Sequence, residues 1–202
     1  MPERGERETT EMGIEEYIVH KLGEKQGQSV VRDMIAECTS LERLCIGENE
    51  ANSKTMRTKI FPRIAMYHVL QKDMPKQQAY DIVWNYTKDC ICVPTRQQYL
   101  RIERVPFFFS LFRKMFLQTM LHSSEWSAEV TQNAADRFGV AIHRCLWNDT
   151  CLKCGCPELC QVFCDSDWEN FGAMRKVKFC RTQTLGIGGN LCDFTFCKIH
   201  RK

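Results

Sequence analysis

The sequence predicts an α+β fold, in which a helical N-terminal half packs on a small antiparallel sheet of about three or more strands with one inserted helix. Before residue 123, apolar residues recur every three or four positions, the period of an amphipathic helix. After residue 137, short β-branched and aromatic runs end at turn-forming residues, as strands do. We expect a flexible leader over 1–12 and a single domain over 13–202, with helices over about 13–123 and the sheet over about 137–199.

Length and composition are those of an ordinary globular protein. The chain has 202 residues, of which 44% are hydrophobic, and a formal net charge of +3. These values exclude a collagen, a low-complexity polymer and a wholly disordered chain. The small, evenly spread charge gives no reason to expect nucleic acid as a partner. The longest apolar stretch, 105–112, is far shorter than the roughly 20 residues of a membrane span, so no membrane partner is expected.

Apolar stripes predict the first helices. The first helix covers 14–22 and the second about 29–46, each with apolar residues at helical spacing. A third helical run covers 49–73, and Pro62 is expected to kink it or to end its first half.

Prolines mark the boundaries of the next segments. Pro75 fits the first turn of a helix, and Pro94 is expected to close that segment. The stretch 95–121 follows, with a break at Pro106. Its second half, 107–121, is so apolar that it predicts a buried central helix.

The C-terminal part predicts the sheet. Strands are expected over 137–147, 176–185 and 191–198, because these runs are rich in aromatic and β-branched residues. The segment 186–190 is glycine-rich and forms the turn between the last two strands. The inserted helix covers roughly 157–171, between the first and second strands.

Cysteine is the one abnormal residue type. There are thirteen cysteines, an odd number, and the N-terminus is polar and acidic with no apolar core of a signal peptide. We therefore expect a reducing, cytoplasmic setting with free thiols rather than a disulfide scaffold. Nine of the thirteen lie in the last 58 residues, namely Cys145, Cys151, Cys154, Cys156, Cys160, Cys164, Cys180, Cys192 and Cys197.

Four of these cysteines define an alternative metal site. Cys151 and Cys154 form a C-x-x-C pair, a metal or redox spacing, and Cys156 and Cys160 follow closely. Zinc or an iron–sulfur cluster is the alternative that this group leaves open, although a second C-x-x-C is missing. The other interpretation is buried free thiols that pack as small apolar groups, and no cofactor is favoured.

The inserted helix places thiol and acid groups together. Cys156, Cys160 and Cys164 are spaced by four, and Asp167 follows at three, so these side chains share one helix face. A thiolate at Cys164 could act as a nucleophile, with Asp167 as a base or an orienting group. The alternative for Asp167 is a solvated helix residue.

Polar residues on the expected strands offer substrate contacts. Arg181 interrupts an apolar strand face, either as a residue at the sheet edge or as the fork that binds a substrate carboxylate. Thr182 and Thr184 lie on the opposite side of Arg181 if the strand is regular, so the three could not all reach one pocket. His143 is either an acid–base group or a structural hydrogen-bond donor.

The C-terminal segment resembles the signature of the L-2-amino-thiazoline-4-carboxylic acid hydrolase family. The family's pattern is approximately Arg-Thr-x-Thr-Leu-x-x-Gly followed by Cys-Asp-Phe-x-Phe, and the upstream Cys160-x-x-x-Cys164-x-x-Asp167 is similar to its Cys- and Asp-bearing helix. The resemblance covers roughly 50–198, with recognisable motifs in the last 45 residues or so. The residues that carry the pattern here run from Arg181 to Gly188 and from Cys192 to Phe196.

The resemblance implies hydrolytic opening of a small sulfur and nitrogen heterocycle at its C=N carbon, which gives an N-carbamoyl-cysteine. It assigns Cys192 or Cys164 as nucleophile, Asp167 as proton-transfer group and Arg181 as the clamp for the substrate carboxylate. The other substrate-binding candidates are Thr182, Thr184, Asp193 and His143. The partner would be a small-molecule substrate, and the oligomeric state stays open, a homodimer included. The competing hypothesis is a cysteine-rich metal- or ligand-binding sensor without catalysis.

Overall fold

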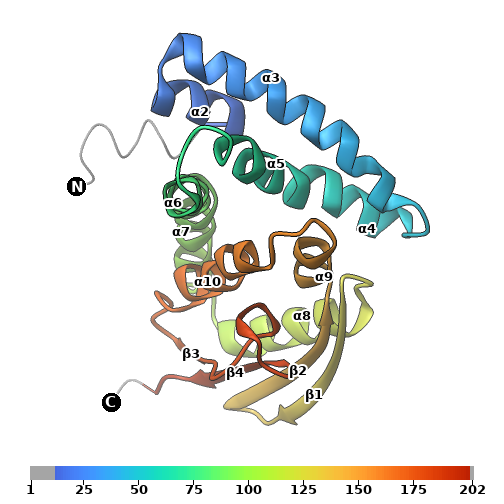
Figure 1. The fold of residues 1–202 in the computed structure, drawn as a ribbon. Helices are drawn as coiled ribbons and strands as arrows, with labels where there is room; N and C mark the ends of the chain where they lie inside the picture. Colours follow the sequence, from blue (N-terminus) through green and yellow to red (C-terminus); the bar gives the residue numbers. More distant parts are fainter. Residues whose placement is uncertain (1–11, 201–202) are drawn as a thin grey trace.

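The protein has an α+β fold in which helices form the N-terminal part and a four-stranded antiparallel sheet lies in the C-terminal part (Figure 1). The structure is a computed structural model and describes residues 12–200. The expected leader over 1–12 therefore lies almost wholly outside the described residues. The division into one domain stays a prediction.

The first two helices pack side by side. Helix α2 is Ile14–Leu22, and α3 is Glu24–Leu41, which begins five residues earlier than its apolar stripe suggested. They are joined by Gly23 alone, whose φ of 82° is a conformation that favours glycine. A short 3₁₀ turn, η1 over Glu42–Cys45, follows α3.

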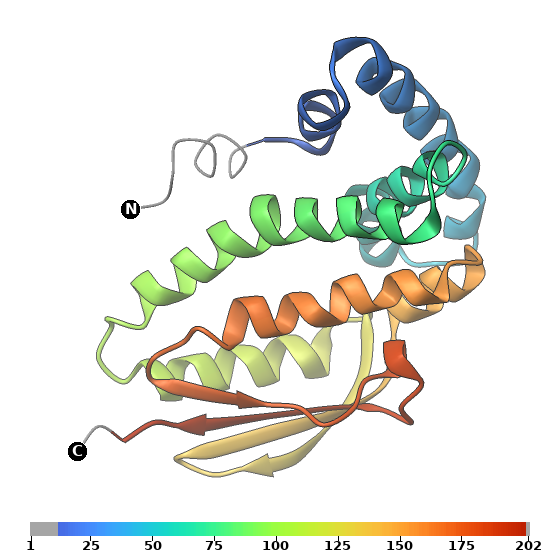
Figure 2. The same cartoon turned by 60° about the vertical axis from the view of Figure 1, so that its left-hand side comes forward.

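Each of two long helical rods contains a π-helical turn that is followed by a proline. The first rod comprises α4 (Glu50–Thr55), η2 (Met56–Ile60) and α5 (Phe61–Leu70), and the second α6 (Lys76–Tyr86), η3 (Thr87–Cys92) and α7 (Val93–Ile102). The expectation that Pro94 closes its helix is wrong. Pro62 and Pro94 each stand in the first turn of the α-helix after the π turn, where a missing backbone N–H is tolerated. The second rod therefore runs on as one curved helix (Figure 2).

Helix α8 covers Phe108–His122 and begins after the break expected at Pro106. Its buried residues include Phe109 and Phe112, which pack against Phe138 of the sheet. The expectation of a buried helix holds for this face only. Leu111 and Met115 keep 44% and 59% of their surface exposed, so the opposite face is open.

The sheet has the strand order β1-β2-β4-β3. Its strands are β1 (Trp126–Asn133), β2 (Arg137–Cys145), β3 (Val177–Cys180) and β4 (Cys192–Lys198). Between β2 and β3 the chain forms α9 (Leu146–Lys153), the 3₁₀ turn η4 (Pro157–Leu159) and α10 (Cys160–Phe171). Helices α8 and α10 cover one face of the sheet, while no helix of residues 12–200 covers the other face (Figure 2). Strand β1 and helix α9 were not expected, and β3 ends five residues earlier than predicted, before the 3₁₀ turn η5 (Leu185–Ile187).

Helix α10 belongs to both of two hydrophobic clusters. The first cluster contains the N-terminal helices, α9 and the start of α10, including Val162. The second contains α8, the sheet and the end of α10, including Phe171. Side chains of both clusters line the cavity described next. Within residues 12–200, none of the helices has the length and apolar character needed to cross a membrane.

Candidate active site

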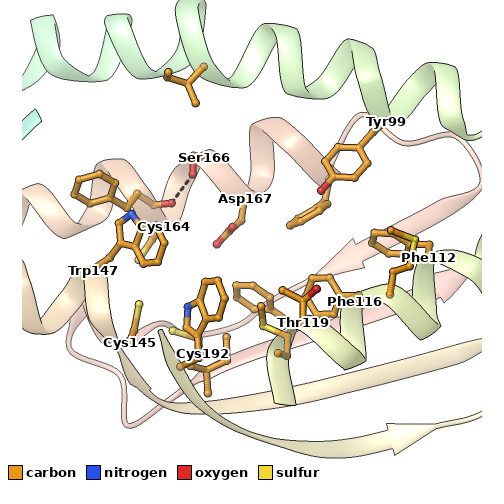
Figure 3. Close-up of a pocket in the computed structure, with 18 of the residues that line it drawn as sticks. Tyr99, Phe112, Phe116, Thr119, Cys145, Trp147, Cys164, Ser166, Asp167 and Cys192 are labelled. Atoms are coloured by element: carbon orange, nitrogen blue, oxygen red, sulfur yellow. Dashed lines mark hydrogen bonds between the residues drawn. The ribbon is translucent and has the colours of Figure 1, made fainter. Parts of the chain in front are cut away.

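A cavity of about 550 Å³ is lined by α7, α8, α10 and strands β2 and β4 (Figure 3). The structure brings the three expected catalytic residues, Cys164, Asp167 and Cys192, to this cavity. Asp167 points into its middle, and Cys192 lies opposite on β4 (Figure 3). Thiol and carboxyl groups from α10 and β4 therefore line the same cavity.

Asp167 is a carboxyl held in an apolar environment. It pairs with Arg181, whose Nη1 lies 3.0 Å from Oδ2 of Asp167. Its side chain keeps 26% of its surface accessible. Burial raises the pKa of Asp167 to about 7, and neighbouring Asp165 adds to this rise while Arg181 opposes it. The group can thus both accept and release a proton near neutral pH, which suits general acid–base chemistry.

Arg181 positions Asp167 rather than facing the cavity. Because β3 ends at Cys180, the chain is no longer a regular strand at Arg181, and the side chain turns toward α10. Its Nη1 also donates to the carbonyl of Cys164 at 2.6 Å, and only 7% of the side chain is exposed. The expected clamp for a substrate carboxylate therefore already binds other groups.

The thiols around the cavity differ in acidity. Burial raises the pKa of Cys192, and the pKa of Cys164 rises because its thiol donates to Cys160. Cys160 also lines the cavity, and hydrogen bonds from Cys151 and Cys164 lower its pKa. It stands at the start of α10, where the helix dipole favours a thiolate. Cys160 is therefore the thiol in this group that ionises most readily.

Arg63 is a cavity residue that the sequence interpretation missed. It lies on α5 after the first π turn, its Nε donates to the carbonyl of Lys59 at 2.9 Å, and its guanidinium lies 4.6 Å from the ring centre of Phe163. Burial lowers the pKa of Arg63 to about 10, so it stays charged at neutral pH. Among the described residues, no carboxylate pairs with it. The only signal in the sequence is an arginine within the apolar run 60–67.

Four other candidates do not line the cavity. His143 is exposed on the sheet and lies 3.1 Å from Glu129. Asp193 accepts hydrogen bonds from the backbone N–H of Thr182 at 2.9 Å and from its hydroxyl at 2.6 Å, which fixes the chain after β3. Thr184 is buried beside Cys164, and its hydroxyl has no partner of normal hydrogen-bond geometry. Asp193, Thr182 and Thr184 therefore lie close to the residues that line the cavity, whereas His143 lies on the exposed surface of the sheet.

The four cysteines of the alternative metal site are not grouped as metal ligands among the described residues. Within residues 12–200, no three His, Cys, Asp or Glu side chains are arranged to hold a metal ion. Cys156 instead hydrogen-bonds to His68, whose Nδ1 lies 2.8 Å from Glu37. These contacts raise the pKa of His68 to about 9, and hydrogen bonds with Cys151 and His68 lower the pKa of Cys156. Three of the four thiols, Cys151, Cys156 and Cys160, thus belong to one hydrogen-bonded network.

The fold and the cavity define an α+β protein in which thiols and a carboxyl line one cavity between helices and sheet. The profile of the L-2-amino-thiazoline-4-carboxylic acid hydrolase family matches residues 53–196, which is most of the chain. The chain belongs to this family, as the C-terminal signature indicated. No curated protein and no solved structure gives a significant match.

Proposed function

We propose that the protein hydrolyses a cyclic amidine acid of the 2-amino-thiazoline-4-carboxylate type, with Asp167 as the proton-transfer group. The family supports the reaction class. The observation that carries the proposal is the carboxyl of Asp167 in the cavity, because burial gives it a pKa of about 7. An acid–base group is most effective when its pKa lies near the working pH.

In this mechanism, Asp167 takes a proton from a water molecule as the water oxygen bonds to the C=N carbon. The ring nitrogen receives that proton as the double bond becomes a single bond. The carbon–sulfur bond then breaks, the added oxygen becomes a carbonyl, and its remaining proton passes to the leaving sulfur. One water is consumed, and the product carries a ureido group and a free thiol, as an N-carbamoyl-cysteine does. Arg181 keeps the Asp167 carboxyl oriented through these steps.

Arg63 is the proposed clamp for the substrate carboxylate. Its charge is buried, faces the cavity and is matched by no carboxylate among the described residues. A guanidinium of this kind binds a carboxylate through two parallel hydrogen bonds. Lys59, one helical turn earlier, also lines the cavity and adds positive charge. This assignment replaces Arg181, which already binds Asp167.

Water rather than a thiolate is the proposed nucleophile. Cys164 and Cys192 have raised pKa values, so both stay neutral near pH 7. Cys192 can act as a weak hydrogen-bond donor beside the substrate, whereas the hydrogen of Cys164 is already donated to Cys160. If the reaction is covalent, the attacking thiol is Cys160. Cys160→Ser separates the two routes, because it should leave most of the rate intact when water attacks directly.

The proposal is tested with Asp167→Asn, which keeps the shape of the side chain but cannot exchange a proton. Hydrolysis of 2-amino-thiazoline-4-carboxylate, followed by mass spectrometry as the gain of one water, should slow by about 10²–10⁴-fold. Asp165→Asn is the matched control, because Asp165 lies 3.8 Å from Arg181 but does not line the cavity. It should lower the pKa of Asp167 somewhat and slow hydrolysis far less than Asp167→Asn does. Equal rates for the wild type and Asp167→Asn, or no hydrolysis by the wild type, would refute the proposal.

A further inference from the structure

The cavity extends well beyond the polar groups around Asp167. Cys145, Trp147 and Cys192 lie on one side of Asp167, whereas Tyr99, Phe112 and Phe116 lie on the other (Figure 3). We call the second region the aromatic arm. It is also lined by Ile102 of α7 and by Leu111 and Met115 of α8.

The size of the cavity does not match one small ring. A volume of about 550 Å³ lies within the range of roughly 300–1,000 Å³ that takes drug-sized ligands. A thiazoline carboxylate held by Arg63 and Asp167 is a single five-membered ring with short substituents. It would leave the aromatic arm unfilled, and water there would find few polar partners.

Exposed apolar side chains at the aromatic arm also indicate that a ligand larger than one small ring binds there. Met115, Leu111 and Ile102 keep 59%, 44% and 37% of their surface exposed although all three line the cavity. These side chains belong to α7 and α8, and both helices line the cavity. A ligand group in the arm would cover apolar surface that otherwise faces water, which favours binding.

We infer that the preferred substrate is a cyclic amidine acid that carries an aromatic substituent, which fills the aromatic arm while the ring lies at Asp167. Tyr99, Phe112 and Phe116 supply the edges and faces that aromatic groups pack against. Tyr99 and Phe112 already meet edge to face at 6.3 Å between ring centres. This inference rests on the proposed function for the ring, whereas the arm itself is a separate feature of the cavity.

The test compares two ligands by calorimetry, 2-amino-thiazoline-4-carboxylate and its 5-phenyl derivative. The wild type should bind the phenyl derivative about 30-fold more tightly, the gain expected from burying one aromatic ring. Met115→Trp and Leu111→Trp narrow the arm at exposed positions, so each should remove most of this gain and leave the parent ligand unaffected. Leu121→Trp is the control, because Leu121 is an exposed residue of α8 that does not line the cavity.

The outcomes separate this inference from the proposed function. Equal affinity of the wild type for both ligands would overturn the inference, as would equal losses in Met115→Trp and Leu121→Trp, even if the parent ligand is hydrolysed. If the phenyl derivative binds more tightly and Met115→Trp abolishes the gain, the arm is confirmed. Should neither ligand then be hydrolysed, the proposed function fails while the aromatic arm stands.

Discussion

Asp167 links the chemistry of the site to the stability of the protein. Below pH 3.8 its carboxyl is protonated in both the folded and the unfolded chain, so burial disturbs stability little. Between pH 3.8 and about 7 the unfolded chain releases this proton while the folded protein keeps it. The free energy of unfolding therefore falls as the pH rises through this window, and the favourable contribution of the neutral acid is lost above about 7.

Asp167→Asn removes this titration. The unfolding free energy of the wild type minus that of the variant should decline by about 2–4 kcal/mol between pH 4 and pH 8. Denaturant unfolding of both proteins across this range measures the difference. A difference that is independent of pH would mean that the carboxyl ionises normally in the folded protein.

Individual residues of the site were predictable only where the sequence spacing is local. Cys160, Cys164 and Asp167 share one helix face because helical periodicity fixes their directions. Arg181 was expected to lie on a regular strand face, and that expectation fails because β3 ends at Cys180, the residue before it. Arg63 reaches the cavity from a segment about 100 residues away, and no local pattern reveals such a contact.

The elements show where local signals mislead. Proline usually ends a helix, yet Pro62 and Pro94 follow π turns that change the hydrogen-bond register before them. Residues of both π turns, Lys59 and Ile91, line the cavity, so the two irregular segments help to shape the site. Strand β1 is mostly exposed, and an apolar pattern cannot reveal a strand that buries few side chains.

The turn after β3 packs closely against helix α10. A Cβ atom on Gly186 would lie 2.8 Å from the Sγ atoms of both Cys160 and Cys164. Gly186→Ala should therefore displace α10 or the turn, lower the unfolding free energy by about 1–3 kcal/mol and slow hydrolysis. Thermal unfolding and the hydrolysis assay measure the two effects.

Gly13→Ala is the control for this change, because a Cβ there meets no atom within 4 Å. The double variant Gly186→Ala, Cys164→Ala should recover part of the lost stability, since it removes one of the two sulfur contacts. Full stability in Gly186→Ala alone would show that the turn stands farther from α10 than described.

At the scale of the whole molecule, the site depends on two hydrophobic clusters that α10 joins. Phe163 belongs to the first cluster and Phe171 to the second, and both line the cavity with Asp167 between them. Burial at this junction is the main cause of the raised pKa of Asp167. The fold class followed from periodicity along the chain, whereas this arrangement depends on long-range packing that periodicity does not encode.

The central claim is that this arrangement gives Asp167 a pKa near neutrality and so enables it to move protons during hydrolysis. The pH dependence of kcat/KM for 2-amino-thiazoline-4-carboxylate tests it most directly. We expect the rate to rise with pH up to an apparent pKa of about 7 as Asp167 becomes a base, and this limb to be absent from the residual rate of Asp167→Asn. A wild-type profile without a limb near pH 7, or an unchanged limb in Asp167→Asn, would contradict the account.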